Sequence, residues 1–157
     1  MVNKNYFVGM TGVYYAAAEL SSRGLIVAAT SRNAPGPDIV ITSPNGTKSI
    51  NIQVKTSGAE QRERFTCSWQ LDEKDENRVA KNLFYIFVDL WPGNKKPDFY
   101  IVPSKTVATY IKRSHAIWLK KRGLGGKKHK ENPRRLYEIY DNATAAKYLN
   151  KWKNLGL

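Results

Sequence analysis

The sequence predicts a mixed α/β protein in which helices pack on a central β-sheet. Three local patterns support this prediction. Small apolar residues recur at helical spacing from Val13 to Arg23, the pair Asn45-Gly46 stands between two β-branched runs, and Leu83 to Leu90 is almost wholly apolar and aromatic. These patterns are typical of a helix, a hairpin and a strand buried on both faces, respectively. The 157 residues fit one domain that covers positions 1–157.

The first helix is expected from Val13 to Arg23, because Thr11 and Gly12 are suited to begin it and Gly24 to end it. The helix carries Glu19, whose neighbours in the sequence are apolar. A short buried strand is expected at 25–29, followed by a loop at 31–37 that is rich in Asn, Pro and Gly.

The hairpin predicts which side chains lie together. If Asn45 and Gly46 form a two-residue turn, Asp38 lies opposite Gln53. Lys55 then points to the same side as Gln53, since side chains alternate between the faces of a strand. The other face is aliphatic and consists of Ile39, Ile41, Ile50, Ile52 and Val54. A carboxylate, an amide and an ammonium group therefore share one polar face, an arrangement that suits metal-assisted cleavage of a phosphodiester.

The later elements are less regular. The segment from Thr56 to Asp75 is polar and broken, with one strand indicated by the alternation of Phe65, Cys67, Trp69 and Leu71. The remaining expected elements are a central strand at 83–90, a strand at 99–102, a helix from Ser104 to about Lys120 with Ser104 as its N-cap, a basic loop at 120–135, a short strand at 136–140, and a final helix from Ala143 to about Lys153 capped by Asp141 or Asn142.

The charge of the chain indicates a polyanionic partner. Lys and Arg number 26 against 13 Asp and Glu, which gives a net charge of +13. DNA is the expected partner and RNA the alternative. No membrane partner is expected, because the sequence has no long apolar run and no lipidation motif. The single cysteine, Cys67, and the lack of a signal peptide favour a cytoplasmic protein.

A basic, glycine-containing segment is the expected surface for nucleic acid. Dense positive charge on a flexible loop suits contacts with a phosphate backbone, although such a loop can also be merely solvated. Its candidate nucleic-acid-binding residues are Lys120, Lys121, Arg122, Lys127, Lys128, Lys130, Arg134 and Arg135.

The polar face of the hairpin suggests a role for each residue. Mg²⁺ prefers oxygen ligands and keeps several waters, so Asp38 is the candidate ligand, and Gln53 can offer an amide oxygen. Lys55 can stabilise negative charge that develops on a phosphate. Glu19, from the first helix, is the candidate second carboxylate.

Helix Glu19, Asp38 after Pro37, and Gln53-Val54-Lys55 together resemble the PD-(D/E)xK nuclease superfamily. The resemblance implies a restriction-endonuclease-like fold, with a mixed central sheet flanked by helices, and a DNA endonuclease that depends on Mg²⁺, for which Mn²⁺ substitutes. It makes Asp38, Gln53 and Glu19 the metal site and Lys55 the catalytic lysine. The sequence departs from the pattern at Gln53, where many members carry Glu or Asp.

Two other functions stay open. The chain could be a nucleic-acid-binding module of the same fold that no longer cleaves, which Gln53 would suit. It could also be a subunit whose charge serves an acidic protein partner. A homodimer stays open, because many members of the resembled family work as dimers to cut two strands, although no dimer interface is evident in the sequence.

Overall fold

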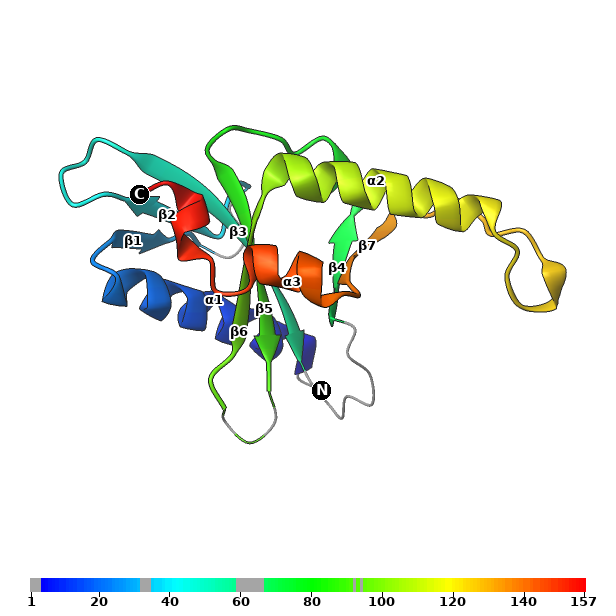
Figure 1. Cartoon of the computed structure of the whole chain (residues 1–157), viewed down its shortest axis with the longest axis horizontal. Coiled ribbons are helices and arrows are strands. Elements are labelled where there is room, and N and C mark those ends of the chain that lie inside the picture. Colours follow the sequence, from blue (N-terminus) through cyan, green and yellow to red (C-terminus); the bar gives the residue numbers. More distant parts are fainter. Residues whose placement is uncertain (1–3, 32–34, 59–66, 92, 94) are drawn as a thin grey trace.

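The computed structural model describes residues 4–31, 35–58, 67–91, 93 and 95–157 (Figure 1). In chain order its helices and strands are α1 (Lys4–Ser22), β1 (Ile26–Ala29), β2 (Ile39–Thr42), β3 (Ser49–Gly58), β4 (Cys67–Asp72), β5 (Leu83–Leu90), β6 (Asp98–Pro103), α2 (Ser104–Lys120), β7 (Arg134–Ile139) and α3 (Asn142–Tyr148). Short 3-10 helices lie at Glu73–Glu76, Leu124–Gly126 and Trp152–Leu155.

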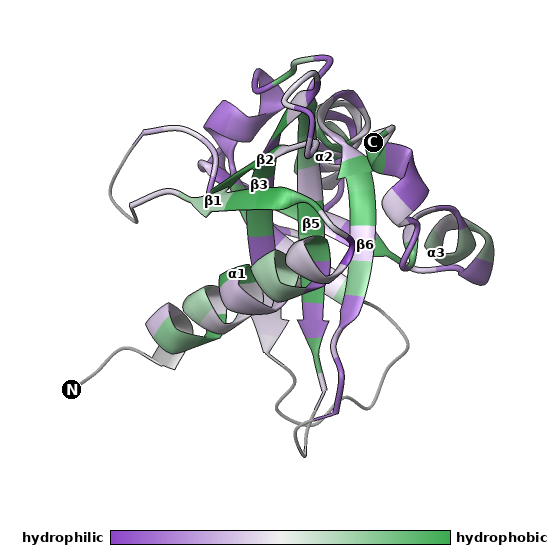
Figure 2. Cartoon of the chain, turned by 90° about the vertical axis from the view of Figure 1, so that its left-hand side faces the viewer, coloured by the Kyte–Doolittle hydropathy of each residue, from purple (hydrophilic) through white to green (hydrophobic). Residues whose placement is uncertain are grey.

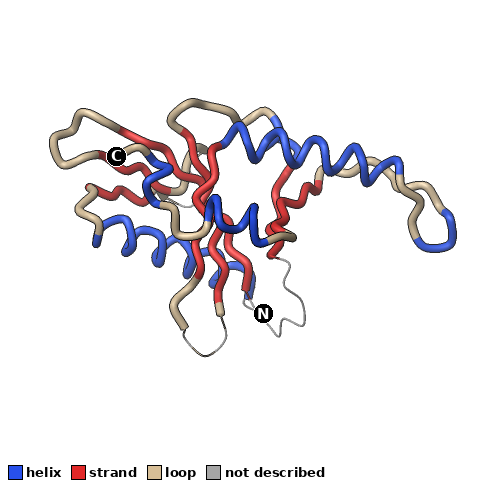
Figure 3. Tube along the Cα trace, viewed as in Figure 1, coloured by secondary structure: helices blue, strands red, loops and turns tan. Residues whose placement is uncertain are grey.

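The main sheet has five strands in the order β1-β2-β3-β5-β6. Strands β3 and β5 are parallel, and the other neighbours are antiparallel. A second, two-stranded sheet pairs β4 with β7 (Figure 3). The mixed α/β class predicted from the sequence is therefore confirmed. The pairing of β4 with β7 was not anticipated.

One face of the main sheet is aliphatic and is covered by α1. Figure 2 shows the hydrophobic strands β1, β2 and β3 behind this helix. Ala16 and Leu20 of α1 are fully buried against the sheet. The strand residues of this core are Ile39, Ile41, Ile50, Ile52, Val54, Ile86, Val88, Phe99 and Ile101. Burial of this many aliphatic side chains is the main favourable term in folding, and it fixes which way the strands face.

The opposite face is divided between an aromatic half and a polar half. On β5 and β6, Tyr85, Phe87, Tyr100 and Val102 pack under α2 and the β4-β7 sheet. Buried Trp69 of β4 links the two sheets, because its Nε1 donates a hydrogen bond to the carbonyl of Val88 on β5, at 2.9 Å. The polar half lies on β2 and β3.

The register of the β2–β3 hairpin matches the prediction. Ile39 pairs with Ile52 and Ile41 with Ile50. The turn itself is longer than predicted: the N–H of Gly46 donates to the carbonyl of Ser43, at 2.8 Å, so Pro44 and Asn45 are its central residues. The loop takes one extra residue from each strand, Pro44 and Thr47, so the pairing of the strands is unchanged.

Two helix starts differ from the prediction. Helix α1 begins at Lys4 rather than near Val13, and Gly9 and Gly12, which resemble breakers, lie inside it. Ser104 does not cap α2; Pro103 holds that position without a side-chain cap. The Ser104 hydroxyl instead exchanges hydrogen bonds with the backbone of Ala80.

Smaller differences concern the edges of the fold. Strand β1 is largely exposed rather than buried. Helix α3 ends at Tyr148, although its predicted cap is correct, since Asp141 accepts from the N–H of Thr144 at 2.7 Å. None of the helices in the described residues combines the length and apolarity that crossing a membrane requires.

Two glycines of α1 give a matched test of its contact with the sheet. A Cβ on Gly12 would lie 1.9 Å from Oγ1 and 2.9 Å from Cβ of Thr56 on β3, so rotating the threonine cannot relieve the clash. Gly12→Ala should therefore destabilise the fold by roughly 1–3 kcal/mol. Gly9, which has nothing within 4 Å, is the control: Gly9→Ala should stabilise by up to about 1 kcal/mol. Chemical denaturation measures both. Equal effects of the two substitutions would contradict the packing described here.

Candidate functional site

Asp38 stands at the entrance to β2, and its carboxylate is held from β3. Oδ2 accepts from the backbone N–H of Val54, at 2.7 Å, and from the side-chain amide of Gln53. In the part of the chain that the structure describes, hydrogen bonds to this carboxylate reach Oδ2 alone, which leaves Oδ1 for another partner. The predicted meeting of Asp38 and Gln53 is therefore found in the structure.

Gln53 is buried, and both ends of its amide are engaged. Nε2 donates to Asp38, while Oε1 accepts from Nη1 of Arg78, at 2.6 Å. This pattern fixes the amide orientation, because a carboxylate needs a donor and a guanidinium needs an acceptor. The amide oxygen predicted as a metal ligand thus faces an arginine.

Arg78 lies in the connection between the 3-10 helix Glu73–Glu76 and β5, and sequence analysis did not identify it. Its second nitrogen, Nη2, donates to the carbonyl of Gly36, at 2.8 Å. Beneath it lies Asp75, with its Oδ1 3.8 Å from Nη1 of Arg78 and its side chain fully buried. Asp75 also accepts from the Tyr85 hydroxyl, at 2.9 Å, and from the Asp72 N–H, at 3.0 Å. Both oxygens of the buried Asp75 carboxylate therefore have hydrogen-bond partners.

Lys55 is half-buried on β3, next to Phe87 on β5 and on the same face as Gln53. Its ammonium group is close enough to Asp38 to lower the pKa of that carboxyl. The predicted trio of carboxylate, amide and ammonium therefore shares one face of the sheet.

Burial has the largest effect on the Asp38 carboxyl and raises its pKa above the ordinary value of 3.8. The Val54 N–H and the positive charges of Lys55 and Arg78 oppose that rise, and Asp75 adds to it. Because the pKa is raised on folding, the ionised Asp38 carboxylate makes the folded state less stable than a protonated carboxyl would.

Glu19 lies elsewhere in the structure. Its carboxylate pairs with Lys96, at 2.7 Å, and with Arg23 one turn along α1, at 3.0 Å. The reason is that α1 covers the aliphatic face of the sheet, whereas Asp38 and Gln53 lie on the opposite face. The carboxylate that acts electrostatically on Asp38 is Asp75, which raises the pKa of Asp38.

The predicted basic segment extends from the end of α2 as an arm, here defined as residues 120–134 (Figure 1). Within the arm, the backbones of Arg122 and Lys128 form an isolated antiparallel β-bridge. The His129 ring stacks on Trp118 of α2, with ring centroids 4.0 Å apart. The predicted residues of the arm are exposed, namely Lys120, Lys121, Arg122, Lys127, Lys128, Lys130 and Arg134.

Arg135 is a correction to the predicted nucleic-acid surface. It is 5% exposed, and its guanidinium binds Glu76 and the carbonyl of Asn132. Its position on β7 is in phase with buried Tyr137 and Ile139, so the alternation directs its side chain inward.

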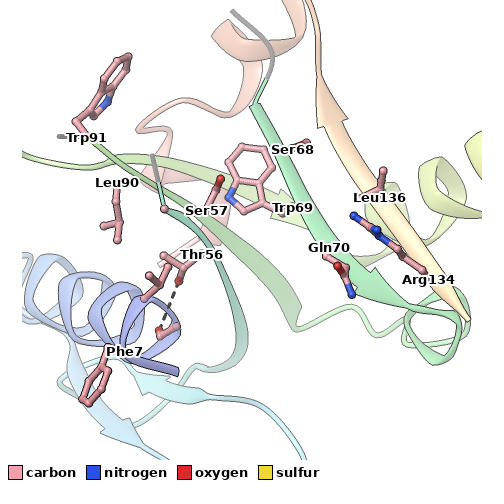
Figure 4. Close-up of a pocket in the computed structure, with 13 residues that line it drawn as sticks. Phe7, Thr56, Ser57, Ser68, Trp69, Gln70, Leu90, Trp91, Arg134 and Leu136 are labelled. Carbon is pink, nitrogen blue, oxygen red and sulfur yellow. Dashed lines mark hydrogen bonds between the residues drawn. The ribbon is translucent and has the colours of Figure 1, made fainter. Parts of the chain in front are cut away.

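A pocket of about 820 Å³ lies where β3 continues past Lys55, between the first turns of α1, the ends of β3 and β5, and the β4-β7 sheet. Figure 4 shows Ser57 of β3 across the pocket from Gln70 of β4 and Arg134 of β7, while Thr56 points towards α1, where its hydroxyl donates to the Gly9 carbonyl at 3.5 Å. Asp38 and Gln53 do not line the pocket. Arg134, at the base of the arm, connects this hollow with the basic surface.

The residues around Asp38 fit a hydrated divalent cation. Clusters of three or more acidic, His or Cys side chains suited to a metal do not occur among the described residues. Mg²⁺ does not require such a cluster, since it is commonly bound by one or two carboxylates together with waters and substrate phosphates. Oδ1 of Asp38 is the oxygen that could serve here, on a carboxylate whose orientation is already fixed.

Comparison with solved structures places the fold. The chain superposes on the bacterial homing endonuclease I-Ssp6803I with a TM-score of 0.59 over 98% of this chain and 95% of that chain, at 14% identity. Hjc, a Holliday junction resolvase of Archaeoglobus fulgidus, matches with a TM-score of 0.40 and 15% identity over 85% of this chain and 91% of that chain. No protein-family model matches the sequence. A search of curated proteins also finds no match. On the first likeness, the chain has the restriction-endonuclease-like nuclease fold, as the motif resemblance implied.

The raised pKa of Asp38 gives a prediction for stability. A carboxyl whose pKa rises on folding is protonated more readily in the folded state, so its charge costs stability above that pKa. Asp38→Asn should therefore raise the free energy of unfolding at neutral pH, and the gain should vanish as pH falls through the raised pKa towards the ordinary value. Denaturant titrations at neutral and acidic pH measure this.

Asp141 provides the control, because its pKa shifts in the opposite direction to that of Asp38. The Thr144 N–H lowers its pKa, so Asp141→Asn should be neutral or destabilising at neutral pH. A loss of stability in Asp38→Asn that persists at every pH would show that the buried carboxylate does not carry the cost described.

Proposed function

We propose that this chain is a Mg²⁺-dependent DNA endonuclease that hydrolyses phosphodiester bonds at Asp38 and Lys55. The observation that carries the proposal is the joint placement of Asp38, Gln53 and Lys55 on one polar face of β2–β3, in a chain with a restriction-endonuclease-like fold. Among the described residues, no buried side-chain nitrogen or oxygen below this face lacks a hydrogen-bond partner. These hydrogen bonds hold the carboxylate in one position, as a reaction centre requires.

The residues divide the chemistry between them. Asp38 would hold Mg²⁺, for which Mn²⁺ would substitute, through Oδ1. When bound, such an ion polarises a phosphoryl oxygen and acidifies water. Lys55, on the same face, places its positive charge where negative charge grows on the phosphate as the P–O bond breaks. Gln53 holds the orientation of Asp38 by donating to Oδ2.

The substrate would enter along the arm. Its exposed lysines and arginines suit phosphate contacts that position a duplex without reading its sequence. Arg134 lines the same pocket as Ser57, so the phosphate backbone would pass from the arm across this pocket to the end of β3. DNA is the proposed polymer. A cytoplasmic location stays a prediction, and RNA as a substrate and a homodimer stay open alternatives.

A second candidate function is a nucleic-acid-binding module of this fold without cleavage. The engagement of the Gln53 amide oxygen by Arg78 favours it, because that oxygen is then not offered to a metal. The same experiments separate the two functions: the module would bind DNA and give no Mg²⁺-dependent product.

Substitutions at the site test catalysis. Asp38→Asn should abolish Mg²⁺-dependent cleavage, and Lys55→Met should lower kcat by about 100- to 1,000-fold, while both variants still bind DNA. Lys48→Met is the matched control, since Lys48 lies at the far end of the same hairpin with its Nζ on the Gly156 carbonyl. Cleavage of a panel of duplex, branched and single-stranded DNA measures the rates. Wild-type activity in either site variant would disprove the assignment.

Salt dependence tests the arm. Replacing Lys127, Lys128 and Lys130 by Ala should reduce the slope of log affinity against log salt by up to about 2.7, because each lost phosphate contact accounts for about 0.9. Binding should weaken equally for unrelated sequences.

The control for the arm is a triple alanine variant of exposed Lys147, Lys151 and Lys153 near the C-terminus, which changes the net charge equally. It should alter the slope much less. If both triple variants behave alike, the arm makes no local contacts with the phosphates.

A further inference from the structure

Arg78 contacts both halves of the Asp38 site. Nη1 donates to Oε1 of Gln53 on β3, and Nη2 donates to the carbonyl of Gly36, two residues before Asp38. A guanidinium presents its nitrogens in a rigid planar fork. One side chain therefore links the two segments whose meeting creates the bond between Gln53 and Asp38.

The position of Arg78 is itself fixed from below. Asp75 is 1% exposed and lies 3.8 Å from Nη1 of Arg78. The Asp75 carboxylate is held by the Tyr85 hydroxyl and by the capping box of the 3-10 helix. A buried carboxylate with these partners has one stable arrangement, because leaving any of its oxygens unpaired would be costly.

The orientation of Gln53 follows from these contacts. With its oxygen on Arg78, the amide must present its nitrogen to Asp38, where it donates to Oδ2. If the amide were reversed, its NH₂ group would face a guanidinium and its oxygen a carboxylate, and both contacts would be repulsive. Without the arginine, the amide oxygen would lose the partner that selects this orientation.

We propose that Arg78 is a positioning residue for the cleavage reaction, which orients Gln53 so that Gln53 acts on Asp38 and does not itself bind the metal. This inference rests on the proposed function. It changes the ligand set predicted from the sequence, because Gln53 leaves the metal site and acts only as a donor to Asp38. Arg78 acts through Gln53 and touches neither the metal nor the reacting phosphate.

The first test is spectroscopic and needs no activity. The side-chain amide resonances of Gln53, identified by their absence in Gln53→Met, should lie apart from those of free glutamine and exchange slowly with solvent. In Arg78→Met they should move to the range of free glutamine and exchange fast. Arg113→Met removes an equal charge from an exposed position on α2 and should leave them unchanged. Unchanged Gln53 resonances in Arg78→Met would overturn the proposal.

The second test is kinetic. Arg78→Met and Gln53→Met should each lower kcat by about 10- to 100-fold, the usual effect of losing a group that orients a metal ligand, with KM for DNA unchanged. The double variant should be no slower than the slower single variant, because both act through one contact. Arg78→Lys should stay well below wild type, since one ammonium nitrogen cannot reach both acceptors. Additive losses, full recovery by lysine, or a rise in KM alone would each overturn the proposal.

The outcomes separate this inference from the proposed function. If Asp38→Asn cleaves as wild type does, the proposed function fails, and the Gln53 resonances still decide whether Arg78 sets the amide orientation. If Asp38→Asn is inactive while Arg78→Met has wild-type kcat and unchanged Gln53 resonances, only the inference about Arg78 fails.

Discussion

The register of the β2–β3 hairpin decides which side chains enter the aliphatic core and which form the polar site. Side chains alternate along a strand, so a slip of one residue would turn Ile52 and Val54 outward and Gln53 and Lys55 into the aliphatic core. The observed pairing of Ile39 with Ile52 prevents this, and α1 secures it by burying the aliphatic face. Burial on one face thus fixes the polar arrangement on the other. The site is a consequence of the packing of the sheet.

The charges around Asp38 determine how readily its carboxylate ionises. The Asp38 carboxylate is partly desolvated but stands near two positive charges, those of Lys55 and Arg78. The buried Asp75 offsets part of that charge and anchors Arg78. In the proposed function, Gln53 and Val54 hold Oδ2, and Oδ1 is left for the metal. Keeping this partly buried carboxylate charged costs folding stability, as perturbed groups at functional sites often do.

The sequence predicted what depends on neighbouring residues and missed what depends on distant ones. The register of the hairpin and the strand at 83–90 were predicted correctly, because alternation and apolar patterning are local, whereas the turn at Pro44 and Asn45 was not. Helical spacing identified Glu19 as a helix residue but could not tell which face of the sheet the helix covers, and α1 covers the side away from Asp38. The start of α1 was missed because Gly12 disfavours a helix unless close packing on Thr56 requires it. Arg78 lies in a polar connection without periodicity, so only the fold brings it to Gln53.

The claim that Asp38 is the metal-binding carboxylate of a nuclease site can be checked by anomalous diffraction from crystals soaked in Mn²⁺. We predict one strong peak within bonding distance of Oδ1 of Asp38, with Gln53 still bonded to Arg78, and no such peak in Asp38→Asn crystals. A peak coordinated by Glu19 in place of Asp38, or no ordered ion near β2–β3, would contradict the claim.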